Sequence, residues 1–572
     1  MFWEKNKNQS VKFFTLPKFT IRLNIITILK FIIESMGENM KMSKKILIFS
    51  LFLILFLGIS AISAADNTTS NLRAADNDNI ADVGNNDMSF AEFKNQIDSN
   101  SKINLNTNVV YNANDNIDKG IVIKKDITIN GNGHTIDAKS KTRVFRVIEG
   151  FTLTLNNINF VNCRMAGENG GVMLIAGNIK ITNCNFTNCN VVGSKTDGGV
   201  ISGAGAGSLT NCNFKQCTAG HYGGAVFSNK LKFTNCNFTG NSASRGGAIG
   251  GTAYLYYCYF DNNIATSTDG GKDDDIGGGA GNGYFPKVES CVFTNCKATK
   301  AFGGALRGTT NAYNSIFINC TSRQGGAIRG KGDSIGCTFI NCVATSSLGG
   351  AVFTQQATVD RCTFTQCSAL NSNGGALYTG KSVKITNCKF ERCSAPKGFG
   401  GAIYGQGVVS KCTFEGNSAK FGGAVSGYGL TVKSSTFTRN SAYKGGAACK
   451  IKSIQSSKLN KNTATYGGAV CNALNVVSSK FGDNSAKYGS VSYNDVNSVF
   501  KKVGIKNTIN LIQGLFFNKK HKLSLTNSKI INSGKINKYL NYNTGVFVYN
   551  KNTLQSTYKV KKIAGPKKAR KK

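Results

Sequence analysis

The stretch Asn235–Gly250 reads NCNFTGNSASRGGAIG, and its parts recur along the chain. Cys236 is followed two residues later by Phe238 and five residues later by Asn241, and a Gly-Gly-Ala step follows a short polar segment. Gly-Gly followed by Ala or Val occurs thirteen times between Gly170 and Gly467, mostly at spacings of 22 to 26 residues. A period of this length is typical of solenoids, in which each repeat stacks on the next.

Alternating apolar and polar residues lead into many of the cysteines, as in LKFTNC (231–236) and VKITNC (383–388). A period of two indicates strands with one buried face. A unit of about 23 residues cannot bury that face alone, but a stack of units can. We therefore predict an all-β protein, a right-handed parallel β-helix of about 17 coils with three short strands in each. Ser89–Ile97 is expected to form a short helix that caps its N-terminal end.

Each motif position is expected to lie above its counterpart in the previous coil. Phe side chains then form an inner aromatic ladder, and Asn side chains bond one another along a turn. The glycines mark a turn with positive φ or close backbone packing. The repeat positions chosen on this basis are Gly223, Gly224, Gly246, Gly247, Gly303, Gly304, Gly325, Gly326, Phe186, Phe214, Phe238, Phe293, Phe364, Asn241, Asn417 and Asn440.

The chain contains 19 cysteines, all between Cys163 and Cys471. Many cysteines in a secreted protein suggest disulfides. Equivalent residues of stacked coils, however, lie about 4.8 Å apart, which exceeds the usual Cβ separation of a disulfide. Ser or Asn also replaces Cys at the same repeat position. The pattern favours free, buried thiols, and it is a poor zinc signal because no His accompanies the cysteines.

The ends of the chain differ from the repeat. Lys44 and Lys45, the apolar run Ile46–Leu57 and the small residues before Asp66 are typical of a secretory signal, although an uncleaved membrane anchor is the alternative. We divide the chain into a possible mis-assigned start (1–41), a signal peptide (42–65), a polar linker (66–87) and the β-helix (88–500). The last segment (501–572) contains final coils in which the repeat pattern decays, followed by a basic tail.

The Gly-Gly-Ala and Phe-x-x-Asn repeat resembles that of chlamydial polymorphic outer-membrane proteins. The Cys-Thr-Phe-x-x-Cys style and the NGNGHTIDA segment (130–138) are more similar to adhesin-like surface proteins of methanogenic archaea. The resemblance covers roughly residues 85–495. It implies the right-handed β-helix of the pectin-lyase-like fold and a protein displayed at the cell surface for adhesion. A shared fold does not fix a function.

Composition suggests the kind of partner. The chain carries 69 Lys and Arg against 29 Asp and Glu, a formal net charge of +40. Such a protein associates with polyanions. A secreted chain is expected to meet cell-surface glycans, wall polymers or other cells rather than nucleic acid, as a monomeric rod with no transmembrane domain after signal cleavage. The tail residues Lys567, Lys568, Arg570, Lys571 and Lys572 are expected to add attachment that salt weakens, unless that end is simply solvated.

The alternative function is a polysaccharide lyase or glycosidase on the same fold. Such enzymes need paired carboxylates or calcium with a basic residue. Asp273, Asp274 and Asp275 are weak calcium candidates in a loop that otherwise reads as solvated. No acidic partner is evident for His134, His221 or His521. We therefore expect a secreted or cell-surface adhesin-like protein that is not an enzyme and has no cofactor.

Overall fold

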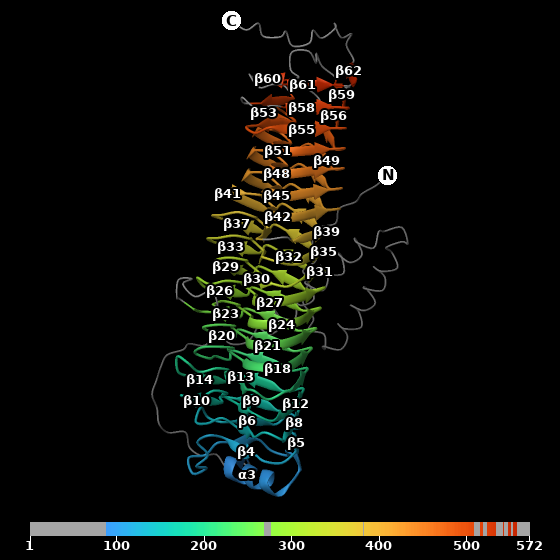
Figure 1. Cartoon of the computed structure of the whole chain (residues 1–572). Helices are drawn as coiled ribbons and strands as arrows, with labels where there is room; N and C mark the ends of the chain where they lie inside the picture. Colours follow the sequence, from blue (N-terminus) through green and yellow to red (C-terminus); the bar gives the residue numbers. More distant parts are fainter. Residues whose placement is uncertain are drawn as a thin grey trace, which may run out of the picture. The chain divides into compact units, whose positions relative to one another are not determined.

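The structure, a computed structural model, describes residues 87–267, 276–380, 383–507, 515–518, 523–532, 541–542, 547–550 and 553–556. The chain divides into two compact units, Met1–Gly84 and Asn85–Lys572, and all the described residues belong to the second. Figure 1 shows the coils of this unit stacked from helix α3 (Phe90–Ser99) toward the last strands. The predictions for residues 1–41, 42–65 and 66–86 lie outside the described residues.

One coil shows how the repeat folds. After the glycine pair at Gly349, the chain forms β34 (Val352–Thr354), bends, and continues as β35 (Thr358–Asp360). A corner leads to β36 (Thr363–Thr365), and a second corner leads to β37 (Ser368–Ala369). This coil therefore has four strands where three were expected, whereas coils in which one strand runs through the bend have three, as in β18 (Val226–Thr234), β19 (Asn237–Thr239) and β20 (Ser242–Ala243). The additional strand forms because the two residues after the second corner still pair with the next coil, as Ser368 does with Ser394.

The strands of successive coils pair in parallel and form three long sheets of 20, 29 and 11 strands. We call these the Phe sheet (β36 and its equivalents), the bend sheet (β34 and β35) and the edge sheet (β37). The stack has about 18 turns, so the all-β parallel β-helix predicted from the repeat is confirmed. Pairing continues past residue 500, where β55 (Ser498–Lys501) pairs with β58 (Leu523–Thr526), and β58 with β61 (Phe547–Asn550).

The Phe sheet contains the strands on which the aromatic residues lie. Its central members are β9 (Asn159–Val161), β13 (Asn185–Thr187), β17 (Asn213–Lys215), β19 (Asn237–Thr239), β22 (Tyr259–Asp261), β25 (Val292–Thr294), β28 (Ile316–Ile318), β32 (Thr338–Ile340), β36, β40 (Lys389–Glu391), β43 (Thr413–Glu415) and β46 (Thr436–Thr438). In each of them the middle residue is a buried Phe.

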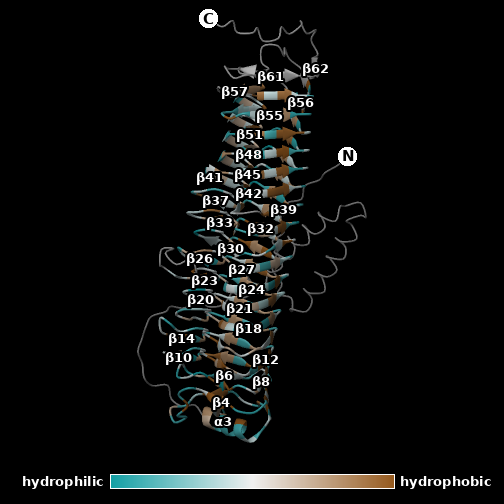
Figure 2. Cartoon of the chain, viewed as in Figure 1, coloured by the Kyte–Doolittle hydropathy of each residue, from teal (hydrophilic) through white to brown (hydrophobic). Residues whose placement is uncertain are grey.

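These phenylalanines form a continuous inner ladder. The rings of Phe317 and Phe339 lie 4.9 Å apart at an angle of 7°, and those of Phe339 and Phe364 lie 4.8 Å apart at 4°. Phe186, Phe214, Phe238 and Phe293 belong to the same stack. Stacked rings add to the free energy gained by burying them. In Figure 2 apolar segments recur in the strands of successive coils, as this core requires.

The two residues of each glycine pair have different tasks. Gly325 has φ of 64°, in the left-handed region that other residues rarely adopt. A Cβ on Gly326 would lie 2.1 Å from the carbonyl oxygen of Gly350 in the next coil. The first glycine therefore allows the turn, and the second allows the coils to approach.

Left-handed residues also form both corners of the coil, and Asn is common there. Asn183 and Asn188 have φ of 56° and 54°, and each is followed by a buried cysteine, Cys184 or Cys189. Asn adopts this region more readily than most residues. The Thr-Asn-Cys sequences thus encode a strand end, a turning residue and an inward side chain.

The buried residue after the second corner is Cys in some coils and Asn in others. The Nδ2 of Asn417 donates to the Oδ1 of Asn440 at 2.9 Å and to the carbonyl oxygen of Phe390 at 3.1 Å. The same pattern links Asn440 to Asn462, and Asn241 to Asn263. Because buried amides are costly without partners, this ladder satisfies the groups that it buries.

All 19 cysteines are free and buried. Their thiols donate to nearby carbonyl oxygens, as Cys184 does to Thr182 at 3.4 Å. Burial raises the pKa of Cys184 from 9.0 to about 12, because the thiolate would lose its hydration. The same effect raises the pKa of Cys320. These thiols act as small apolar residues with a weak donor.

The predicted N-terminal cap is present. Ser89 caps α3, since its side chain accepts from the backbone N–H of Glu92 and the Glu92 carboxylate accepts from the Ser89 N–H. Phe90, Phe93 and Ile97 of the helix are buried against the first coils. Across the described residues, no helix combines the length and apolar character that crossing a bilayer requires.

Replacing Phe317 by Ala is expected to lower the free energy of unfolding by about 3–5 kcal/mol, because it leaves a cavity in the middle of the ring stack. Chemical denaturation followed by circular dichroism would measure the loss. Tyr257→Ala is the matched control, since that residue is 61% exposed, and its effect should stay within about 0.5 kcal/mol. Equal effects of the two variants would contradict a ladder on which the coils depend.

Native protein at pH 8 should leave its 19 thiols unlabelled by an aromatic disulfide reagent, and unfolded protein should react at all of them.

The raised pKa of Cys184 also predicts that the free energy of unfolding depends on pH. The stabilising contribution of a thiol such as Cys184 is complete below pH 9 and is lost as the pH rises toward 12. Urea titrations from pH 7 to 10 would detect the decline. Cys184→Ser should retain the fold with a smaller decline, because Ser315 occupies the equivalent corner and bonds the Tyr313 carbonyl. Rapid labelling of the native protein would contradict burial.

Candidate functional site

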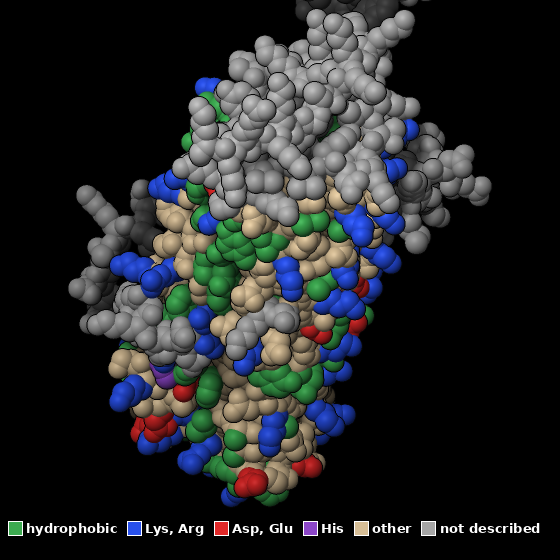
Figure 3. Space-filling view, turned by 45° about the horizontal axis from the view of Figure 1, so that its top comes forward, with side chains coloured by type: hydrophobic (Ala, Val, Ile, Leu, Met, Phe, Trp, Pro, Cys, Tyr) green, Lys and Arg blue, Asp and Glu red, His purple; other side chains and the backbone are tan. Residues whose placement is uncertain are grey.

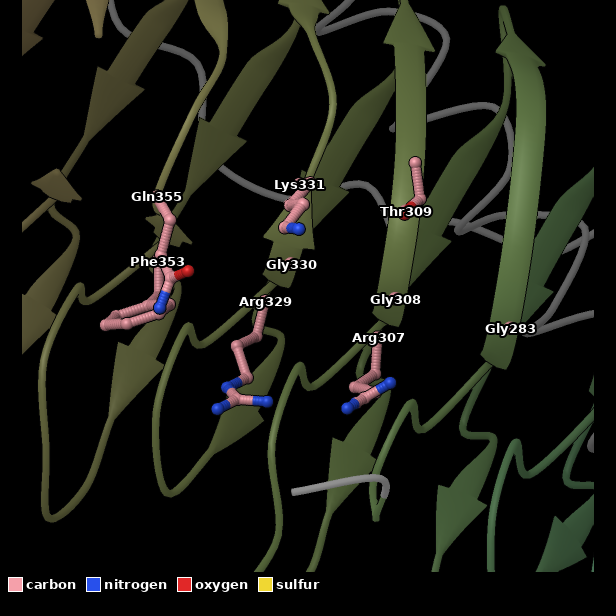
Figure 4. A pocket seen from close by; sticks show the side chains of 9 residues that line it. All are labelled: Gly283, Arg307, Gly308, Thr309, Arg329, Gly330, Lys331, Phe353 and Gln355. Atoms are coloured by element: carbon pink, nitrogen blue, oxygen red, sulfur yellow. The ribbon is translucent and has the colours of Figure 1, made fainter. Parts of the chain in front are cut away.

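A groove lies on the bend sheet where its strands turn. Its volume is about 410 Å³, and its lining residues are Gly283, Arg307, Gly308, Thr309, Arg329, Gly330, Lys331, Phe353 and Gln355. They come from four successive coils, through β24 (Gly281–Glu289), β27 (Leu306–Tyr313), β30 (Ile328–Lys331) and β34. We call it the first groove, and Figure 4 shows its residues.

Glycines at the bend create the hollow. A Cβ on Gly308 would lie 1.9 Å from the Gly283 carbonyl oxygen, and one on Gly330 would lie 1.8 Å from that of Gly308. Gly308 also has φ of 111°. Three glycines in register therefore bring the coils together and leave no side chains over the floor.

Two arginines on neighbouring coils form one wall. Arg307 and Arg329 are register partners, and Figure 4 shows them side by side and pointing the same way. The guanidinium carbon of Arg329 lies 4.2 Å from the centroid of the Phe302 ring and 5.6 Å from that of Phe353. Its Nε donates to Oε1 of Gln324 at 2.9 Å. Rings and an amide thus hold the cation in place at the edge of the groove.

Lys331 and Gln355 extend the site beyond the bend, and Lys331 is exposed. None of the nine described residues that line the groove is acidic, and Arg307, Arg329 and Lys331 give this lining a positive charge. Figure 3 shows the same imbalance on the face in view, where Lys and Arg are more numerous than Asp and Glu. The site is suited to anions, with Arg forks that match carboxylate or phosphate oxygens.

The sequence pattern did not single out these residues, although a signal was present. Arg307, Arg329 and Phe353 each directly follow a Gly-Gly-Ala-[Leu/Ile/Val] motif, as do Tyr378 and Tyr404. Alignment of the repeats on their glycines places all five in one column. That Lys331 lines the same groove as Arg329 depends on the position of the bend, which the sequence does not mark.

The expectation that His221 lacks an acidic partner was wrong. Its Nδ1 lies 3.3 Å from Oδ1 of Asp197, and its Nε2 lies 2.6 Å from Nη1 of Arg245. Asp197 and Arg245 belong to the coils before and after His221. A separation of one repeat on each side indicates that these residues are neighbours, but not that their side chains meet.

The other candidates of the sequence analysis are placed as follows. The selected Gly, Phe and Asn residues lie in the turns, ladder and corners described above, and not in the groove. Asp273–Asp275, His521 and the tail lysines with Arg570 lie outside the described residues. Within the described ranges, no group of three His, Cys, Asp or Glu side chains could hold a metal ion.

Two family models match parts of the chain. A model described as a right handed beta helix region matches residues 326–486. A model described as adenovirus EB1 55K protein / large t-antigen matches residues 82–269. Neither covers half of the chain, and no curated protein and no solved structure matches it. The first description agrees with the fold and with the right-handed winding predicted from parallel crossovers.

Replacing Gly308 by Ala should destabilise the coils around the first groove by more than 1 kcal/mol, since the new Cβ would collide with the backbone of Gly283 and the φ is unfavourable. Thermal unfolding would measure the loss. Gly504→Ala is the control, because the nearest atom to its Cβ would be 3.9 Å away. If both variants unfold at the wild-type temperature, the close approach of coils at the bend is not required.

Proposed function

We propose that the chain is a secreted or cell-surface, adhesin-like protein that binds anionic polymers and does not transform them. The observation that carries this proposal is the first groove, whose described lining contains Arg307, Arg329 and Lys331 and no acidic residue. The ligands that fit are acidic glycans and anionic wall polymers. The family resemblance and the signal-like segment at 42–65 support the location.

The arrangement of the groove favours binding over hydrolysis. A glycosidase needs two carboxyl groups on either side of the scissile bond, one of them acting as an acid. The groove instead presents fixed cations and Phe353, whose ring offers an apolar surface. Arg329, which is held by two rings and an amide, suits the oxygens of an acidic chain, because little of its side-chain freedom is lost on binding.

The geometry of a β-helix also suits weak contacts that repeat. Coils are spaced at about 4.8 Å, so equivalent side chains form rows along the axis. A polymer with regularly spaced charges can contact such a row at several points. Each exposed contact contributes only about 0.2–1 kcal/mol, and affinity comes from their number.

The test measures binding and reaction together. Full-length protein in reducing buffer is mixed with polygalacturonate, linear polyphosphate or neutral dextran, and bound protein and new sugar ends are measured in the same samples. We expect saturable binding to the two anionic polymers, weaker binding at high salt, and no new ends. Arg307→Gln/Lys331→Gln should weaken binding about tenfold, since two contacts of about 0.7 kcal/mol sum to about 1.4 kcal/mol.

Lys458→Gln/Lys480→Gln is the matched control. These exposed lysines are register partners on the outer face of the Phe sheet, in β49 (Lys458–Asn460) and β52 (Lys480–Gly482). This variant removes the same charge away from the groove and should bind within twofold of wild type. New sugar ends would instead favour the lyase or glycosidase alternative. Equal losses of affinity in the two variants would show that binding depends on the net charge of the protein and not on the groove.

A further inference from the structure

A second groove follows the same bend of the β-helix a few coils further on. Its volume is about 490 Å³, and its lining residues are Val383, Lys384, Gln406, Gly407, Val408, Ser410, Gly429, Thr431 and Lys452. They come from β39 (Lys384–Thr386), β42 (Ile403–Ser410), β45 (Val425–Lys433) and β48 (Ala448–Gln455), and from Val383 beside β39. Lys384 and Lys452 are exposed, and none of the nine lining residues is acidic.

Glycines again form the floor. A Cβ on Gly407 would lie 2.2 Å from the Val383 carbonyl oxygen, and one on Gly429 would lie 2.7 Å from Cγ of Gln406. At Gly407 a side chain is excluded for the same steric reason as at Gly308, whereas at Gly429 it would meet the side chain of Gln406. The second groove thus also lies at the bend, with Lys384 and Lys452 after the bend instead of arginines before it.

One column of residues at the bend joins the two grooves. Thr309 pairs with Lys331 in the first groove, and Gln406 pairs with Gly429 in the second. Gln355 of the first groove lies next to Gly380 of the intervening coil. The two backbones are so close that a Cβ added to Gly380 would be 3.4 Å from the Cα of Gln355. Thr379 precedes Gly380, and its hydroxyl donates to the carbonyl oxygen of Gln406, a residue of the second groove, at 2.8 Å.

The grooves therefore share a single line along the axis. It passes through eight successive coils at β24, β27, β30, β34, β38 (Leu377–Thr379), β42, β45 and β48. Seven steps of about 4.8 Å make its length about 34 Å. Cations occur at intervals along this line: Arg307, Arg329 and Lys331 in the second and third coils, Lys384 in the fifth and Lys452 in the eighth.

We propose that both grooves bind one linear polyanion, which lies parallel to the solenoid axis along the bend. The inference rests on the function proposed above and adds a second site and an orientation. A chain that occupies both grooves gains affinity without new types of contact, because the second contact is made at the high effective concentration set by the first. Repeated carboxylates and repeated phosphates both supply the required charge.

The test compares short and long chains on the full-length protein. Fluorescent oligogalacturonates and polyphosphates of about three and about twenty units are titrated by anisotropy. Lys384→Gln/Lys452→Gln should weaken the binding of long chains about tenfold and leave that of the three-unit chains within twofold, because a short chain still occupies the first groove. Lys458→Gln/Lys480→Gln should leave both within twofold, and thermal unfolding should match wild type for each variant.

The outcomes separate the two proposals. If Lys384→Gln/Lys452→Gln binds long chains as the control does while Arg307→Gln/Lys331→Gln does not, the second site is wrong and the proposed function stands. If wild-type protein binds neither polymer, both proposals fail. Loss with only one of the two polymers supports the single-chain arrangement and identifies carboxylate or phosphate as the charge that is recognised.

Discussion

Everything in this β-helix depends on the close approach of one coil to the next at the glycine pairs. The second glycine of each pair faces a carbonyl oxygen at a distance that leaves no room for Cβ, as at Gly326 and Gly350. Because the coils meet there, Phe317 and Phe339 stack at 4.9 Å and Asn417 reaches Asn440. The aromatic and amide ladders thus require a spacing that glycine permits.

The same steric rule connects the fold to the grooves. Glycines at the bend, such as Gly308 and Gly330, are excluded from carrying side chains by the backbone of the preceding coil. The result is a hollow beside fixed strands, and the residues on either side of it are free to vary without disturbing the core. Arg329 and Lys331 occupy such positions, one before the bend and one after it.

Much of the fold could be predicted because its determinants repeat. A Phe or a glycine pair that recurs every coil points to one position in a stack, and the capping box at Ser89 and Glu92 is a local signal. The grooves are different, since they depend on residues that change from coil to coil. Arg329 becomes significant only beside Arg307 and Phe302, and that grouping requires the register of the strands.

Two further features were beyond the sequence for physical reasons. The edge-sheet strand has only two residues in several coils, as in Ser368–Ala369, which is too short for a periodic pattern. The contact of Asp197 with His221 joins residues one coil apart, and it depends on side-chain conformations that bring Oδ1 and Nδ1 within 3.3 Å. Repeat length predicts that such residues are neighbours, but not that their side chains meet.

The buried thiols have a consequence for the order of events during synthesis. In the stacked coils each thiol is shielded from solvent, whereas in the emerging chain all 19 are open to oxidants. A disulfide formed at that stage would join positions that the finished stack keeps at the spacing of separate coils, and it would stop the winding there. Wherever an oxidant is present, the coils must therefore stack before their thiols are oxidised.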